Sequence, residues 1–175
     1  MQYVDHWTAS DGAGLTIRPI RPEDEPMMVA FHQSLSERSV YLRYFHMMNV
    51  GQRTTHERLT GICFIDYDRE MALVAERPQA GAGLGREIVG VGRLTRKRGV
   101  NEAELAVLIS DVFQRRGLGT ELVRRLIDIA RKEKVERLTA DILAENRNMQ
   151  RICESLGFHM QYEPDDGMVT AELRL

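Results

Sequence analysis

Polar and glycine residues cluster where a strand-like segment gives way to a long amphipathic helix. The stretch reads Gln114-Arg115-Arg116-Gly117-Leu118-Gly119, and Thr120 follows it. The first turn of a helix exposes backbone N–H groups without partners and carries about half a positive charge, which suits phosphates. Glycines there let the backbone approach a ligand closely, because no Cβ intervenes. The stretch therefore predicts a loop that binds a phosphate-bearing ligand.

Three kinds of phosphate loop compete for this stretch. A nucleotide P-loop requires a lysine after its last glycine, whereas Gly119 is followed by Thr120 and Glu121. A dinucleotide-binding turn requires a different glycine spacing beside the first strand of a parallel unit. The third pattern, Q/R-x-x-G-x-G/A, resembles the pyrophosphate loop of the GNAT superfamily of N-acetyltransferases. An ordinary helix start with solvated arginines is the alternative.

The resemblance extends to the segments on both sides of the loop. The loop follows a strand-like run, Ala103–Ser110, and a second strand precedes a helix with the family pattern N-x-x-A-x-x-x-Y-x-x-x-G-F. That helix carries Asn146, Met149, Cys153 and Gly157-Phe158 at matching spacing. The likeness covers roughly residues 15–175 and implies an acetyltransferase that uses acetyl-CoA as cosubstrate and no metal.

The resemblance also implies which residues hold coenzyme A. The pantetheine arm would pair with the backbone in a gap between two splayed strands, 103–110 and 137–143. The phosphates would lie on the loop amides, with Asn146 near the thioester. The implied set is Val107, Leu108, Ile109, Gln114, Arg115, Arg116, Gly117, Leu118, Gly119, Thr120 and Asn146.

Glu104 is the candidate catalytic residue. An acceptor amine must lose a proton before it attacks, since a lysine ammonium has an ordinary pKa of about 10.4. The resemblance implies that a glutamate of this strand acts as the general base, often through a water molecule. Glu104 shares one face of the strand with Ala106, Leu108 and Ser110. The alternative is a charge at the strand's rim beside Glu102.

The sequence defines the groups that stabilise the oxyanion and protonate the leaving thiolate less well than it defines the general base. The resemblance implies that a backbone N–H near Leu108 or Ile109 holds the oxyanion. The usual general acid is the tyrosine of the helix pattern, but Cys153 stands there. Its thiol could donate the proton, water could, or the thiolate could leave unaided. Cys153 could also carry the acetyl group, although a half-buried structural cysteine is the simpler interpretation.

Two further stretches bear on the acceptor. Residues 15–45 and 59–76 resemble the acetyltransferase domain of bacterial protein-lysine acetyltransferases that act on acyl-CoA synthetases. An acyl-CoA synthetase is therefore a candidate protein substrate. Tyr41, Arg43, Tyr44 and His46 could contact the acceptor or simply pack. The alternatives are an acetyltransferase for a small amine (polyamine, antibiotic or amino acid) and a non-catalytic acetyl-CoA sensor.

The elements that position these residues follow from periodicity and turn residues. We expect an N-terminal hairpin, helices from Pro22 to about Cys63, three antiparallel strands, a helix, a strand, a helix and two strands. The expected strands are 15–20, 70–76, 87–96, 103–110, 137–143, 158–163 and 168–174, with a helix over 117–134. This is an α/β (α+β) arrangement with a mixed, mostly antiparallel sheet, splayed between its fourth and fifth strands.

Length, composition and charge limit the classes of partner and the domain organisation to be expected. The chain of 175 residues has a net charge of −2, so no strong field favours nucleic acid or an anionic membrane. We expect one GNAT domain over 15–175, with residues 1–14 as an N-terminal hairpin extension. No apolar run approaches the ~18 residues of a membrane span. The two cysteines and five histidines lack metal-ligand spacing, and a reducing cytoplasmic setting is expected. The glycine-rich stretch Gly81–Gly85 is expected to be a disordered loop.

Overall fold

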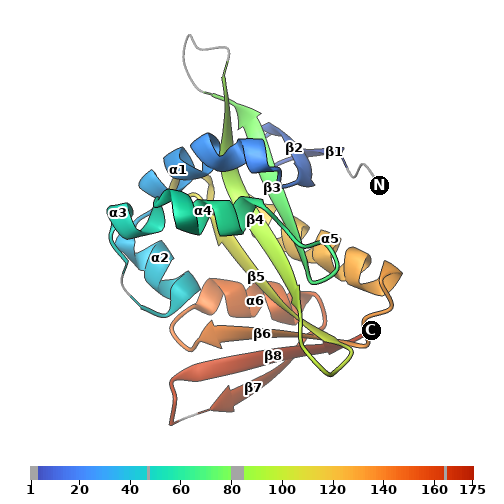
Figure 1. The fold of residues 1–175 in the computed structure, drawn as a ribbon. Helices are drawn as coiled ribbons and strands as arrows, with labels where there is room; N and C mark the ends of the chain where they lie inside the picture. The colour runs from blue at the N-terminus through green and yellow to red at the C-terminus, as the bar shows by residue number, and fades with distance from the viewer. Residues whose placement is uncertain (1–3, 47, 80–84, 164) are drawn as a thin grey trace.

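The computed structural model describes residues 4–46, 48–79, 85–163 and 165–175, which form one sheet between two layers of helices (Figure 1). The glycine-rich loop expected at 81–85 lies, but for its last residue, outside the described residues. The sheet has eight strands in the order β1-β2-β3-β4-β5-β6-β8-β7. The strands are β1 (Asp5–Thr8), β2 (Gly14–Pro19), β3 (Glu70–Pro78), β4 (Arg86–Arg96), β5 (Glu102–Ile109), β6 (Arg137–Leu143), β7 (His159–Glu163) and β8 (Met168–Arg174).

The sheet is mixed and mostly antiparallel, as expected from the sequence. Only β5 and β6 run parallel, and their pairing is limited to three residue pairs that begin at Glu102 and Arg137 and end at Glu104 and Thr139. Beyond that point the two strands part, whereas β4 stays paired with β5 as far as Ile109. The expected splay is thus confirmed, between the fifth and sixth strands because β1 is counted first.

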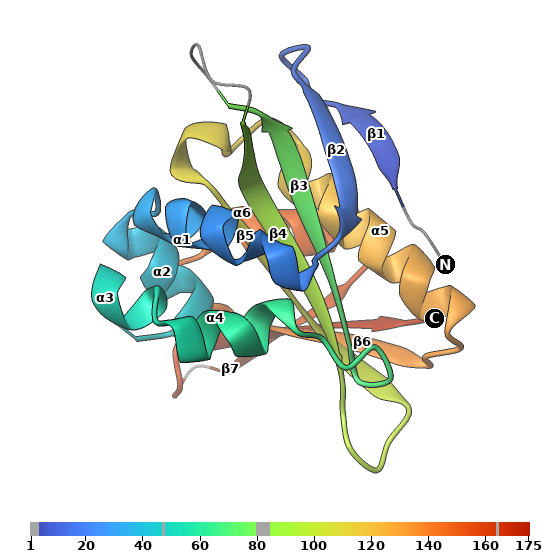
Figure 2. The ribbon, with the colours of Figure 1, turned by 45° about the horizontal axis from the view of Figure 1, so that its top comes forward.

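The helices divide between the two faces of the sheet (Figures 1 and 2). On one face lie α1 (Glu25–Gln33), α2 (Glu37–Tyr44), α3 (Val50–Arg53) and α4 (His56–Cys63). The other face carries α5 (Leu118–Lys132) and α6 (Arg147–Ser155). Each layer buries its own apolar cluster, and side chains of β5 alternate between them: Leu105 packs with α5, Leu108 with the α1–α4 layer.

Helix α5 follows from its sequence pattern. Its apolar residues recur at helical spacing and are all buried: Leu118, Leu122, Val123, Leu126, Ile127 and Ala130. The helix begins one residue later than expected and ends at Lys132 rather than Lys134. Lys134 has a left-handed φ of 57°, which ends the helical backbone. The strong stripe fixes the helix against β4 and β5, so its N-terminus faces the splay.

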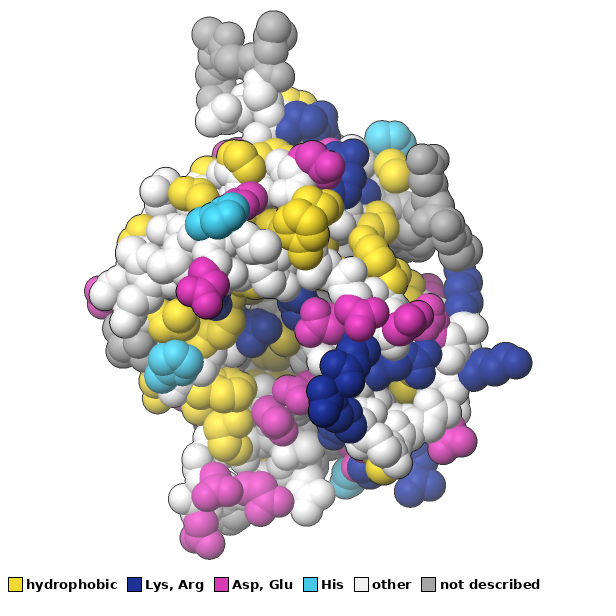
Figure 3. All heavy atoms as spheres, in the orientation of Figure 1, with side chains coloured by type: hydrophobic (Ala, Val, Ile, Leu, Met, Phe, Trp, Pro, Cys, Tyr) yellow, Lys and Arg dark blue, Asp and Glu magenta, His cyan; other side chains and the backbone are white. Residues whose placement is uncertain are grey.

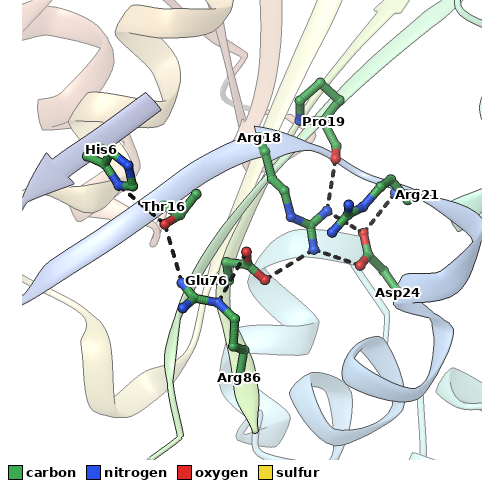
Figure 4. A network of polar contacts seen from close by, with 8 residues as sticks. All are labelled: His6, Thr16, Arg18, Pro19, Arg21, Asp24, Glu76 and Arg86. Carbon is green, nitrogen blue, oxygen red and sulfur yellow. Dashed lines mark hydrogen bonds and ion pairs between the residues drawn. The ribbon is translucent and has the colours of Figure 1, made fainter. Parts of the chain in front are cut away.

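A buried ion network anchors the start of α1 to the sheet (Figure 4). Arg18 of β2 donates two hydrogen bonds of 2.7 Å to Asp24 and one of 3.2 Å to Glu76 of β3. Arg86 adds an ion pair of 3.2 Å to Glu76. Burial disfavours the charge on Arg18, but the hydrogen bonds that it donates to both carboxylates outweigh this effect, and the pKa of Arg18 is raised. This network holds the α1–α4 layer in place over β3 and β4.

Among the described residues, no helix has both the length and the apolar character needed to cross a bilayer.

Candidate active site

A cavity of about 240 Å³ opens where β5 and β6 part. Residues 104–109 of β5 and 140–142 of β6 form two of its walls. Helix α2 covers one end, and the loop before α5 together with the start of α6 closes the other. Of the residues expected to bind coenzyme A or act as base, the cavity gathers all except Arg116: Glu104, Val107, Leu108, Ile109, Gln114, Arg115, Gly117, Leu118, Gly119, Thr120 and Asn146.

The backbone of β5 faces this cavity at alternate residues. Ser110 donates its N–H to the carbonyl of Val89 on β4, at 2.8 Å. Because direction alternates along an antiparallel strand, the N–H and C=O groups of Val107 and Ile109 point away from β4 and toward the gap. Leu108 directs its backbone to β4 instead, so of the expected strand contacts only Val107 and Ile109 can pair with an extended ligand arm.

The loop before α5 supplies a row of unpaired backbone N–H groups. Among the described residues, the first amide after Gln114 with a backbone partner is that of Glu121, which donates to the carbonyl of Gly117 at 3.1 Å. The amides of residues 115–120 therefore stand without backbone acceptors at the positive end of a 15-residue helix. This row fits the pyrophosphate of coenzyme A, which carries the charge that such a helix end binds.

The two loop glycines serve different purposes. Gly117 has a φ of 87°, a left-handed conformation that L-residues adopt only with strain. A Cβ at Gly119 would lie 3.0 Å from the Cδ1 atom of Ile152 on α6. The sequence interpretation assigned both glycines to close approach of a ligand. In the structure Gly117 makes the turn, and Gly119 lets α5 and α6 approach each other.

The two loop arginines also differ. Arg115 lines the cavity and is exposed. Arg116 turns to the N-terminal hairpin, where it forms an ion pair of 2.7 Å with Asp11 and lies over the ring of Phe113, 4.6 Å from its centroid. The guanidinium of Arg116 is thus held by the hairpin, outside the cavity, while its backbone remains in the loop.

Gln114 connects the loop to α2 through hydrogen bonds. Its side-chain amide donates to the carbonyl of Ile109 and to the hydroxyl of Ser39, each at 3.1 Å. Asp111 reinforces this connection, because its carboxylate accepts hydrogen bonds from the N–H and hydroxyl of Ser36, at 2.9 and 2.6 Å. Ser36 is the N-cap of α2, and its side chain accepts the N–H of Ser39. The loop and α2 are thus positioned together.

Asn146 stands at the start of α6, as its motif predicts. Its side-chain oxygen accepts the N–H of Met149 at 3.2 Å, which caps the helix. The amide nitrogen of Asn146 has no partner among the described residues, so it can donate into the cavity that the residue lines. Helix α6 ends at Ser155, and Gly157 follows its C-cap with a left-handed φ of 92°, as is common just past a helix end.

Glu104 lies exposed at the mouth of the splay, the last β5 residue to pair with β6. Its side chain shares a face with Ala106 and Leu108, the face toward the α1–α4 layer. Arg43 of α2 lines the same cavity. Burial lowers the pKa of Arg43, and the negative charge of Glu104 partly offsets that effect. A carboxylate therefore stands where an acceptor approaching along the α2 side would meet a thioester in the gap.

A second cavity, of about 100 Å³, adjoins the first and shares Arg43, Ala106 and Leu108 with it. Of the residues proposed from sequence to border the acceptor, Arg43 and Tyr44 line it. His46 instead contacts the carbonyl of Tyr44 through its Nδ1, at 2.8 Å, and Tyr41 lines neither cavity. Sequence reasoning missed His32, Arg58 and Arg93, which reach this cavity from α1, α4 and β4. No local motif marks them, because distant segments bring them together.

Cys153 does not reach the reacting groups. Its side chain has no exposed surface, packs in the cluster beneath α5, and lines neither cavity. Burial raises its pKa to about 12. Met149 and Ile152 of the same helix face the main cavity instead. The two chemical roles considered for Cys153, proton donor and acetyl carrier, are therefore not supported, and the structural role is.

Comparison with known proteins agrees with this geometry. The family model described as acetyltransferase (GNAT) domain matches residues 14–159. An acetyltransferase of Pseudomonas aeruginosa is 35% identical over 164 residues, which cover 93% of this chain and 85% of that protein. The acetyltransferase Pat of Mycolicibacterium smegmatis is 26% identical over 93% of this chain, which spans only 46% of that longer protein.

Solved structures share the fold. The GNAT domain of S. lividans PAT superposes with a TM-score of 0.84 at 24% identity, covering 98% of this chain and 97% of that one. Mycobacterium smegmatis RimJ in complex with CoA-disulfide superposes with a TM-score of 0.73 at 15% identity, covering 98% and 86%. These likenesses establish the fold, which is that of acetyltransferase domains.

Proposed function

The chain belongs to the GNAT family of acetyltransferases and is an acetyl-CoA-dependent acyltransferase, and on that premise we propose that it acetylates the ε-amine of a lysine in a protein, with Glu104 as the general base. The observation that carries the proposal is the meeting of Glu104, the open backbone of β5 and the amide row of the α5 loop in one cavity. A relative named acetyltransferase Pat and the likeness of residues 15–45 and 59–76 to protein-lysine acetyltransferases support the choice of acceptor.

Backbone and side-chain groups around the cavity together bind acetyl-CoA. The amides of residues 115–120 and the side chain of Arg115 hold the phosphates of acetyl-CoA. Val107 pairs with the pantetheine arm as a neighbouring strand would, Ile109 directs its N–H to the thioester, and Asn146 donates a hydrogen bond near it. Arg116 contributes its backbone only. Two reduced, buried cysteines are consistent with a cytoplasmic setting for this reaction.

In the chemical step the amine nitrogen attacks the thioester carbonyl carbon. Glu104 accepts the proton that the amine loses, directly or through one water molecule. The N–H of Ile109 faces the gap and donates to the carbonyl oxygen as negative charge develops on it. The C–S bond then breaks, and the thiolate leaves and takes a proton from solvent. The products are the acetylated amine and free coenzyme A, with the proton returned from Glu104 to water.

The positive charges near Glu104 affect which small molecules can serve as acceptors. Arg43 and Arg58 line the cavity beside Glu104, where they would repel a polyamine or an aminoglycoside. An acceptor pocket for such polycations would instead be lined with carboxylates. This observation disfavours polycationic acceptors but leaves amino acids as a second candidate class, since these carry a negative charge of their own.

The proposal is tested with labelled acetyl-CoA, this protein and a bacterial extract separated into macromolecular and small-molecule fractions. We expect label on a protein, located by mass spectrometry on a lysine, with an acyl-CoA synthetase as the first candidate. Label confined to small molecules would reject the protein-lysine acceptor. Saturable CoA binding without thiol release on any acceptor would favour a sensor.

The role of Glu104 is tested by Glu104→Gln. We expect turnover to fall about 10²–10⁴-fold, the usual contribution of a general base, because the amide cannot accept the proton. The Kd for acetyl-CoA, measured by calorimetry, should stay unchanged since the amide row and the β5 backbone are intact. Glu136→Gln, at an exposed residue that lines neither cavity, is the matched control. A fully active Glu104→Gln enzyme would reject this base.

A further inference from the structure

The smaller cavity, behind β5, is lined by positive charge. Arg43 comes from α2, Arg58 from α4 and Arg93 from β4, and no carboxylate lines it among the described residues. Figure 3 shows dark blue side chains set into a hollow of the surface that carries α2 and α4. Arg53 lies close by in α3, with a side chain only 2% exposed. Four guanidinium groups therefore surround one small region of the fold.

Most of these charges lack a carboxylate partner. Arg93 has one, an ion pair of 3.2 Å with Glu70. Arg53 donates only to backbone carbonyls, those of Met48 and His32, at 3.0 and 2.9 Å. Arg58 likewise donates to the carbonyl of Arg53, at 3.2 Å. Arg43 makes no hydrogen bond or ion pair with any described residue, and the carboxylate that acts on its charge is that of Glu104.

Aromatic stacking orients two of the arginines. The guanidinium carbons of Arg43 and Arg58 lie 4.7 and 4.9 Å from the centroid of the same Tyr44 ring. Stacking orients both groups and uses none of their N–H donors, of which only one nitrogen of Arg58 donates a hydrogen bond to a described residue. Beside them His32 is 1% exposed, and its Nδ1 has no partner. The cavity thus holds oriented donors and a buried, unpaired imidazole nitrogen.

Such an arrangement is costly unless a negative group completes it. A charge removed from water needs an opposite charge or several hydrogen bonds to offset its lost hydration. The pKa of Arg43 is lowered by burial and by the neighbouring Arg93 and Arg58, which shows how poorly its charge is compensated. Guanidinium groups bind planar carboxylates through paired hydrogen bonds. A carboxylate between Arg43 and Arg58 would therefore satisfy both.

We propose that this cavity is an anion subsite that binds a carboxylate carried by the acceptor close to its amine. The inference rests on the proposed transfer of acetyl to a lysine amine, and it adds the requirement that the acceptor carries a carboxylate near that amine. The two cavities meet at Arg43, Ala106 and Leu108, on the strand face that also carries Glu104. One acceptor can thus present its amine to Glu104 and its carboxylate to Arg43 and Arg58. The carboxylate can belong to an acidic residue beside the lysine or to a free amino acid.

Matched acceptor pairs test this inference. One pair is a peptide whose lysine is flanked by glutamates and the same peptide with glutamines. The other is Nα-acetyllysine and Nα-acetyllysinamide, which share one ε-amine and differ only in the carboxylate. We expect the anionic member of at least one pair to react with a kcat/KM about tenfold higher, corresponding to about 1.4 kcal/mol. Preference in the peptide pair alone identifies a protein substrate, and preference in the Nα-acetyllysine pair identifies an amino acid.

Variants show whether these arginines cause the preference. Arg43→Gln and Arg58→Gln should each reduce the preference several-fold by raising KM for the anionic member. Arg58 lines only the smaller cavity, so Arg58→Gln should change KM for the neutral member little. Arg98→Gln, in the exposed turn between β4 and β5, removes the same charge outside both cavities and should keep the preference. Melting temperatures establish that each variant is folded. Arg43 lies in α2 and Arg58 in α4, so the two variants test the subsite from two separate helices.

Calorimetry of the same pairs separates this inference from the proposed function. Selective binding of the anionic member with no turnover would reject lysine acetylation and support the subsite. Equal binding and equal rates within both pairs would overturn the subsite and leave lysine acetylation standing. A preference that survives both Arg43→Gln and Arg58→Gln would also overturn it.

Discussion

Cys153 departs from the family pattern, which has a tyrosine at this position, and its burial in the fold decides what the residue does. The sequence places it at the position of a catalytic tyrosine. The fold buries it completely in the α5 cluster, while Met149 and Ile152 take the cavity-facing positions of the helix. The pattern predicts the helix and its register. It does not predict the function of the replaced side chain, because a shorter residue packs inward where a tyrosine can extend toward the thioester.

Both cysteines should therefore be unreactive in the folded protein. Burial raises the pKa of Cys63 to about 11 and that of Cys153 to about 12, so the nucleophilic thiolate is a very small fraction at pH 8. We expect a thiol-specific disulfide reagent to label neither residue at pH 8, and both to react at once in denaturant. Fast labelling of Cys153 in the folded state would contradict its assigned burial.

The Cys153→Ala variant extends this test to catalysis. We expect it to keep acetyl transfer within about twofold of wild type, since water and not the thiol protonates the leaving thiolate. Its melting temperature should fall slightly, because a small cavity is left in the core. A large loss of turnover at unchanged acetyl-CoA affinity would reinstate the thiol as proton donor.

The candidate site could be predicted from sequence wherever a local motif carries the information. The resemblance to the GNAT family implied that Glu104, the α5 loop and Asn146 serve one site, and one cavity gathers them. The ion pair of Arg116 could not be predicted from a local motif, because its partner, Asp11, is 105 residues away in the sequence. Arg58 and Arg93 were missed for the same reason, since only the packed fold brings α4 and β4 to the face of β5 that carries Glu104.

At the scale of elements, the α5 loop depends on a left-handed turn at Gly117. Gly117→Ala should cost about 1–2 kcal/mol of stability through backbone strain and should also weaken acetyl-CoA binding, because the amide row shifts. The comparison is Gly99→Ala, at a φ of 77° with no atom near the added Cβ. That control should show a similar loss of stability in urea unfolding and an unchanged Kd for acetyl-CoA.

A similar loss of affinity in both variants would mean that reduced stability, and not loop geometry, weakens binding.

Element boundaries were predicted best where apolar periodicity is strong. Strands β6 and β8 and the stripe of α5 match the expected residues. The segment between Pro22 and Cys63 was expected to be helical with breaks, and it forms four short helices. Their boundaries were less clear, because they depend on side-chain caps such as Asn49 and Thr55, which accept backbone N–H groups at the starts of α3 and α4. A single polar residue leaves a weaker signal than a repeated apolar pattern.

At the scale of the whole molecule, His32 should make stability depend on pH. Burial and the nearby Arg58, Arg53 and Arg43 lower its pKa to about 4, against an ordinary value of 6.5. The folded state therefore holds His32 neutral, and its contribution is complete above about pH 6.5 and is lost as the pH falls toward 4. We expect the free energy of unfolding to drop by about 2 kcal/mol from this group between pH 7 and pH 5.

Urea unfolding at the two pH values measures this drop. His32→Leu should remove that part of the pH dependence, whereas His159→Leu, at an exposed position, should retain it. An identical pH dependence in wild type and His32→Leu would show that His32 is not held neutral by the fold.

The N-terminal hairpin has a consequence for how tightly the cosubstrate is held. Ser10 donates its N–H to the carbonyl of Arg116 at 3.2 Å, Asp11 pairs with the Arg116 side chain, and the ring of Trp7 lies against Gly117. The family match begins only at residue 14, so these contacts come from outside it. We expect these contacts to preorganise the loop before α5, which would lower the conformational entropy lost when acetyl-CoA binds. On this interpretation, hairpin residues that line neither cavity affect the affinity for the cosubstrate.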